Sequence, residues 1–191
     1  MGIYLNPGYD LFLDAIRSEI YVDKTEMISY LNSLIGTKQK YLAVSRPRRF
    51  GKTMAVDMLC AYYDRSVDSR PYFERLKIAE KEAHMAPINP LNPDGEKREI
   101  RWDLYLNHFN VIRLNMIDFM KSWSSVEDML SYLQDEVTAE LMDAYPEIRY
   151  GRVIDLETVM TKIHGKTREQ FVIVIDEWDC LFRRFKEDIK G

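Results

Sequence analysis

Apolar side chains recur at helical spacing in four stretches of the chain. We predict helices over residues 25–34, 53–64, the segment that follows residue 124, and 155–163. The second of these is apolar nearly all round, as a buried helix would be. Gly36 and Gly165 are expected to end the first and the last. Ser124 and Glu127 have the spacing of a capping box, which predicts where the long third helix begins.

Short apolar runs with strand character alternate with these helices. They cover residues 41–45, 110–116 and 171–175. Because strands this uniformly apolar are typical of parallel sheets covered on both faces, the pattern predicts an α/β fold. Residues 86–99 contain three prolines and a Pro-Asp-Gly turn, so we interpret them as a surface loop or insertion in one domain.

The composition narrows the classes of function. A chain of 191 residues suits one well-buried domain, and a net charge of −4 argues against a general nucleic-acid binder. No apolar run approaches the roughly 20 residues that span a bilayer, and the N-terminus lacks the features of a signal peptide. Cys60 and Cys180 form no CxxC pair, which predicts buried thiols in a reducing cytoplasm. The histidines show no metal-ligand spacing.

The stretch SRPRRFGKT, residues 45–53, has the character of a phosphate-binding loop between a strand and a helix. Gly51, Lys52 and Thr53 fit the last three positions of the pattern G-x-x-x-x-G-K-[ST], although Arg46 stands where its first glycine is expected. In such a loop glycine lets the backbone approach phosphate, lysine supplies a positive charge and threonine offers a hydroxyl to Mg²⁺. Taken alone, the same residues also suit a basic surface for nucleic acid.

A second motif favours the phosphate loop. Asp176 and Glu177 follow the apolar run at 171–175, at the strand end where parallel α/β sheets bind ligands. An Asp in this place can hold the magnesium of a bound nucleotide, and an adjacent Glu can orient and deprotonate water. The alternative is that Asp176 caps the next helix while Glu177 stabilises its first turn.

Together these motifs resemble the AAA-ATPase-like family of bacterial and archaeal proteins. The shared segments are YVDKT at 21–25, RPRRFGKT at 46–53, YFERLKIAE at 72–80 and IDEWD at 175–179, and the resemblance spans residues 10–185. It implies a P-loop NTPase fold, a three-layer α/β/α arrangement with strand order 5-1-4-3-2. The same resemblance accounts for Arg46, because the family itself carries arginine there.

The resemblance also implies roles for individual residues, with ATP or ADP and Mg²⁺ as cofactors. Lys52 would contact the β- and γ-phosphates, Thr53 and Asp176 would hold Mg²⁺, and Glu177 would activate water. Further residues expected to bind the nucleotide are Arg48, Arg49, Phe50, Gly51 and Asp23. Residues 21–25 would lie over adenine, or Asp23 and Thr25 would only cap the following helix. At least one of the two arginines is expected to hold the loop in shape.

Residues 1–191 are interpreted as the N-terminal part of one P-loop ATPase domain, with an N-terminal segment and helix over 1–36 and the core over 37–191. The family pattern expects a further central strand, a sensor residue and an arginine finger after residue 191. Partners beyond the nucleotide would be DNA, through a nuclease-like C-terminal domain, and other copies of the chain, but no membrane. Three functions stay open: Mg-dependent ATP hydrolysis, a nucleotide switch with little hydrolysis, and, least favoured, nucleic-acid binding.

Overall fold

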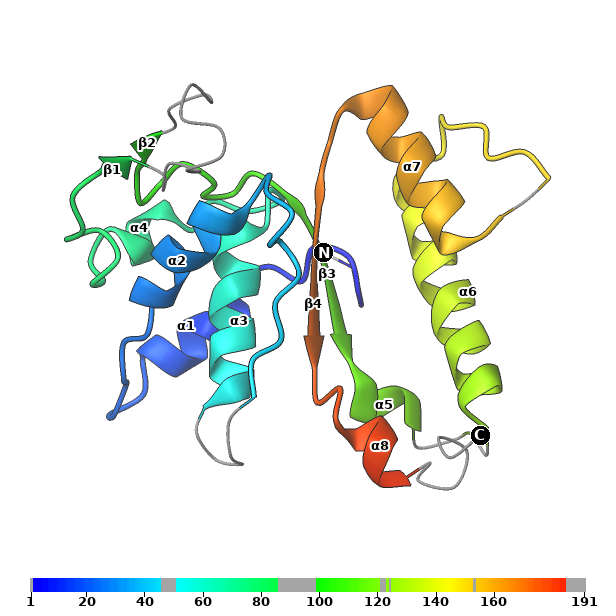
Figure 1. Ribbon diagram of the computed structural model, residues 1–191, viewed down its shortest axis with the longest axis horizontal. Helices are drawn as coiled ribbons and strands as arrows, with labels where there is room; N and C mark the ends of the chain where they lie inside the picture. Colours follow the sequence, from blue (N-terminus) through cyan, green and yellow to red (C-terminus); the bar gives the residue numbers. More distant parts are fainter. Residues whose placement is uncertain are drawn as a thin grey trace. The chain divides into compact units, whose positions relative to one another are not determined.

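The chain forms a mixed α/β protein with a small parallel sheet. The computed structural model describes residues 2–45, 51–85, 99–120, 123, 125–152 and 154–184 (Figure 1). The chain divides into two compact units. One comprises Tyr9–His108, and the other combines Met1–Gly8 with Phe109–Gly191. In the described part of the chain, none of the helices is long and apolar enough to cross a bilayer.

The Tyr9–His108 unit is mainly helical. Its elements are α1 (Asp10–Ile16), α2 (Glu26–Leu34), α3 (Lys52–Tyr63), α4 (Arg70–Phe73), and the strands β1 (His84–Met85) and β2 (Glu99–Ile100), which pair antiparallel. The predicted helices over 25–34 and 53–64 are therefore confirmed. Phe12 of α1 stacks on Phe73 of α4 with ring centroids 4.9 Å apart, and Tyr62 of α3 meets the same ring edge-on at 5.3 Å. This aromatic cluster forms the core of the unit.

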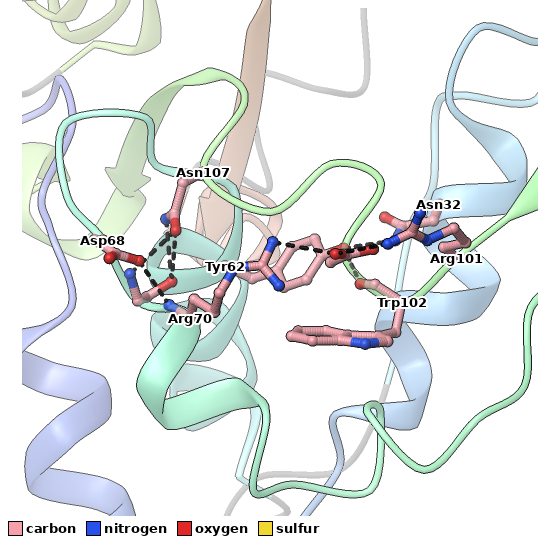
Figure 2. A network of polar contacts seen from close by, with 9 residues as sticks. Asn32, Tyr62, Asp68, Arg70, Arg101, Trp102 and Asn107 are labelled. Carbon is pink, nitrogen blue, oxygen red and sulfur yellow. Dashed lines mark hydrogen bonds and ion pairs between the residues drawn. The ribbon is translucent and has the colours of Figure 1, made fainter.

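A polar network fixes the end of α3 to the segment that leads out of the unit (Figure 2). The Asn107 side chain donates to the Asp64 carbonyl at 2.8 Å and accepts from the Ser69 N–H at 3.1 Å. The buried Tyr62 hydroxyl accepts from Asn32 at 2.9 Å and donates to the Trp102 carbonyl. Because these polar groups are satisfied by one another, α3 keeps a buried polar end without the desolvation penalty of unpaired groups.

The other unit contains the parallel sheet. Its elements are β3 (Asn110–Asn115), α5 (Met116–Met120), α6 (Val126–Ala144), α7 (Leu156–Thr167), β4 (Phe171–Asp176) and α8 (Cys180–Arg184). β3 and β4 pair in parallel, with Asn110 opposite Phe171 and Asn115 opposite Asp176. The long connection through the helices is what a parallel pair requires. Figure 1 shows α6 and α7 side by side, and both supply buried side chains to the core beneath β3.

The predicted strands at 110–116 and 171–175 and their parallel arrangement are confirmed, with Met116 already in α5. The side chains of β3 are largely buried, whereas Ile173 and Ile175 of β4 are 49% and 47% exposed. The described residues thus cover β4 less completely than its apolar sequence led us to expect. Cys60 and Cys180 are buried and not disulfide-bonded, as predicted.

An N-terminal arm, residues 2–8, covers the edge of β3 opposite β4. Leu5 forms an antiparallel bridge with Ile112, and the Arg113 N–H donates to the Tyr4 carbonyl at 2.9 Å. The Glu140 carboxylate of α6 accepts from the N–H groups of Tyr4 and Leu5 at 2.9 and 3.1 Å. Because an open strand edge invites pairing with other chains, the arm and its carboxylate anchor protect the sheet.

Three local predictions are wrong. Residues 41–45 form no strand, because no described segment offers them a hydrogen-bonding neighbour, and Tyr41 is 83% exposed. α7 runs through Gly165 and ends at Thr167. Its C-cap residue, Arg168, adopts a φ of +65° and donates its N–H to the His164 carbonyl at 2.8 Å.

The third error concerns the start of α6, which is capped one residue later than predicted. The Ser125 hydroxyl accepts from the Asp128 N–H at 3.1 Å, so Asp128 rather than Glu127 occupies the third helical position. Ser124 itself lies outside the described residues, as do residues 86–98 of the predicted loop. Glu99, the last residue of that loop prediction, belongs to β2.

Candidate functional site

The first part of the candidate site is the N-terminus of α3. Gly51 is its N-cap residue and has a φ of +70°, a left-handed conformation that other residues adopt only with strain. Lys52 and Thr53 follow as the first two helical residues, and the first turn contains no acidic side chain. The unpaired N–H groups and the dipole of this helix end favour a bound anion. Arg46–Phe50, including Arg48, Arg49 and Phe50, lie outside the described residues.

A cavity of about 300 Å³ adjoins this helix start, inside the same unit. It is lined by Ile20, Tyr21, Val22, Lys24, Gly51, Met54, Ala55 and Met58. The segment before α2 and the first two turns of α3 therefore face one another across an apolar space. Burial, with the Asp23 carboxylate as a smaller cause, raises the pKa of Tyr21 to about 12, so its hydroxyl stays protonated at neutral pH. The sequence alone did not single out Tyr21 or Lys24 as individual lining residues.

Asp23 and Thr25 join two segments that are distant in the sequence. The Asp23 carboxylate accepts from the Thr25 hydroxyl at 2.7 Å and from the Thr25 and Lys77 N–H groups, both at 2.8 Å. The Thr25 hydroxyl in turn accepts from the Ile78 N–H at 3.1 Å. Thr25 precedes α2 as its N-cap residue but makes no side-chain cap bond. These side chains thus fix residues 23–25 against residues 77–78, in the YFERLKIAE segment.

Removing the Asp23 carboxylate should destabilise this unit. Burial acts to raise the pKa of Asp23, but the hydrogen bonds from Lys77 and Thr25 lower it more, so the pKa lies below its ordinary value. The carboxylate therefore contributes stability above about pH 4, and that stability is lost as the pH falls through the lowered pKa. Asp23→Ala should cost about 1–3 kcal/mol in the free energy of unfolding at pH 7.

Urea unfolding from pH 7 to pH 3 tests this prediction, with Asp14→Ala, an exposed acid of α1, as the matched control. The difference between wild type and Asp23→Ala should shrink below pH 4, whereas the control should follow wild type. A difference that does not change with pH would contradict the assigned role of the carboxylate.

The second part of the candidate site lies at the carboxyl end of β4. Asp176 is the last residue of the strand and only 5% exposed, and its carboxylate accepts from the Glu177 N–H at 2.9 Å. Glu177 has a φ of +53° and accepts at its carbonyl from the Cys180 N–H, which begins the turn into α8. Asn115 ends β3 opposite Asp176. The parallel register that brings Asn115 beside the two acids was not visible in the sequence.

The two parts belong to different units. Gly51, Lys52 and Thr53 lie in the Tyr9–His108 unit, and Asp176 and Glu177 in the unit with the sheet. Each part is a local arrangement of its own: a helix N-terminus beside an apolar cavity, and a pair of acids at a strand end.

Two residues of the candidate site, Thr53 and Asp176, offer oxygen atoms as possible ligands for Mg²⁺. Among the described residues, no three His, Cys, Asp or Glu side chains cluster as a protein-only metal site requires. The Thr53 hydroxyl in one unit and the Asp176 carboxylate in the other are each an oxygen donor of the kind that Mg²⁺ accepts, and Mg²⁺ usually keeps waters and phosphate oxygens as its other ligands. A Mg²⁺ ion held at either part would therefore need water or phosphate oxygens as further ligands.

Comparison with known proteins agrees with this chemistry. The family model described as "Predicted AAA-ATPase" matches residues 13–188, nearly the whole chain. No curated protein and no solved structure matches the chain significantly. The matched range includes the helix start at Gly51, the cavity-lining residues and both acids that follow β4. The chain belongs to the AAA-ATPase-like family, whose predicted activity is consistent with nucleotide binding.

Proposed function

We propose that this chain binds Mg-ATP and Mg-ADP in a P-loop ATPase domain and that this domain hydrolyses ATP. The observation that carries the proposal is the left-handed Gly51, which opens α3 directly before Lys52 and Thr53 and beside an apolar cavity. A helix N-terminus of this kind recognises phosphate, and an apolar cavity next to it suits a nucleobase.

Each residue then has a defined task. Lys52 supplies positive charge to the β- and γ-phosphates, while Thr53 and Asp176 hold the Mg²⁺ that accompanies the nucleotide. When bound, this Mg²⁺ would supply positive charge to the phosphates. Glu177 accepts the proton of the attacking water as the general base. The nucleobase would lie in the cavity against residues 20–24, where Ile20, Val22 and Met54 offer apolar contact.

The strand pairing supports the expected P-loop order. In the order 5-1-4-3-2 of the family, the strand that ends in the metal-binding acid pairs with the strand that precedes it in the sequence. β4 ends in Asp176 and pairs with β3, the strand that precedes it, in the same way.

Lys52→Ala should strongly weaken Mg-ATP and Mg-ADP binding. Loss of a charge-assisted contact to phosphate should weaken binding by at least ten-fold, and more where two phosphates share the contact. Calorimetric titration of the wild-type chain and the variant checks this, with Lys38→Ala, an exposed lysine of the same unit, as the control. Equal affinities of wild type and Lys52→Ala, or no binding by the folded wild-type chain, would overturn the proposal.

A further inference from the structure

Lys24 reaches from the segment before α2 to the first turn of α3. A methyl group in place of the Gly51 hydrogen would lie 2.7 Å from the Lys24 Nζ atom, so the ammonium lies directly over the left-handed turn. Lys24 and Gly51 also line the same cavity. The ammonium is therefore next to the backbone that the proposed function assigns to phosphate.

The backbone on both sides of Lys24 is fixed. Asp23 is bound to the Lys77 N–H, and Thr25 to the Ile78 N–H. Thr25 is fully buried, whereas the Lys24 side chain is exposed. A lysine whose backbone is held on both sides places its long side chain with less loss of conformational freedom on binding than a lysine in a free loop.

The electrostatics of this helix end favour a multiply charged anion. α2, α6 and α7 carry acidic side chains in their first turns, among them Glu26, Glu127 and Glu157. In α3 the first turn has no acid, starts with Lys52 and lies beneath the Lys24 ammonium. Two ammonium groups at the positive end of a helix dipole are stabilised by a ligand with several negative charges.

We propose that Lys24 is a second lysine of the nucleotide site and contacts the polyphosphate of ATP from the N-terminal segment. This inference rests on the proposed function and adds to it a residue outside the phosphate loop. It also gives residues 20–24 a chemical task besides apolar contact with the base. The ligand class that follows is a nucleoside di- or triphosphate, because a nucleoside without phosphate offers Lys24 no charge.

The test compares ATP with adenosine in displacement titrations against a fluorescent ATP analogue. In Lys24→Met the affinity for Mg-ATP should fall about ten-fold or more, and the affinity for adenosine should stay within about two-fold of wild type. Lys24→Arg should restore most of the ATP affinity, because arginine also binds phosphate. Lys38→Met, which removes an exposed lysine from the same unit, should bind both ligands as wild type does.

Two results would overturn the role of Lys24 but leave the proposed function intact. The first is an ATP affinity unchanged in Lys24→Met. The second is an equal loss of affinity for ATP and for adenosine, which would mean that Lys24 only packs against the cavity. Lys52→Ala, titrated in parallel, separates this failure from that of the proposed function. If wild type binds ATP and Lys52→Ala does not, the phosphate site stands whatever Lys24 does. If neither binds, both proposals fall.

Discussion

Replacing Glu177 with Gln is expected to lower ATP hydrolysis by about two to four orders of magnitude and to leave Mg-ATP affinity within a few-fold of wild type. Glutamine keeps the size and hydrogen-bonding capacity of the side chain but cannot accept a proton from water. Glu177 is half-buried beside Asp176, in the turn that its own carbonyl closes with the Cys180 N–H. Because this turn is held by backbone groups, the substitution should leave its conformation unchanged.

Single-turnover phosphate release, in a chain for which hydrolysis by the wild type has been established, measures the effect. Asp179→Asn is the matched control, since it removes an acid two residues further along the same turn. If Glu177→Gln hydrolysed ATP at the rate of wild type, Glu177 would be excluded as the general base. Loss of ATP binding would instead make it a binding residue. A wild-type protein that binds ATP tightly but never turns it over would be a nucleotide switch, which is the alternative function.

The sequence predicted the elements that show a regular apolar pattern within one continuous segment. α3 is apolar all round and was recognised for that reason, and β3 and β4 are short apolar runs between turn signals. Residues 41–45 have the same apolar character, yet they form no strand. A strand forms only beside another strand that supplies hydrogen bonds. The sequence of a single segment does not show whether such a strand lies next to it.

The candidate site divides in the same way. Gly51 and Asp176 were identified by motif, because a phosphate turn needs glycine and an acid directly after an apolar strand is recognisable in the sequence itself. Lys24 and the Glu140 anchor of the N-terminal arm were not located, because each depends on tertiary contacts across long stretches of sequence. For Asp23 the sequence allowed a ligand contact or a helix cap, and the structure adds a third role, the link to residues 77–78.

Phe12→Ala should destabilise the unit that carries the helix start and the cavity by about 3–5 kcal/mol. Phe12 is 0% exposed, stacks on Phe73 and meets the Tyr21 ring edge-on at 6.4 Å. The substitution leaves a cavity between α1 and α4 and removes two aromatic contacts, each of which adds to the cost of lost burial. Because Tyr21 lines the cavity in which we propose that the nucleotide binds, ATP affinity should fall as well, even though Phe12 is not one of the lining residues.

Leu11→Ala provides the control for this prediction, because Leu11 lies on the same helix but is 51% exposed. Both substitutions introduce alanine, the residue with the best helix propensity. A difference in the free energy of unfolding between the two variants therefore reflects burial and not helix formation. Urea unfolding followed by circular dichroism should place Leu11→Ala within about 1 kcal/mol of wild type and Phe12→Ala well below it. Similar losses for the two variants would mean that the Phe12–Phe73 stack does not support the unit. Tyr21 would then have to be held in the cavity wall by its backbone neighbours, through the Asp23 and Thr25 bonds to residues 77–78.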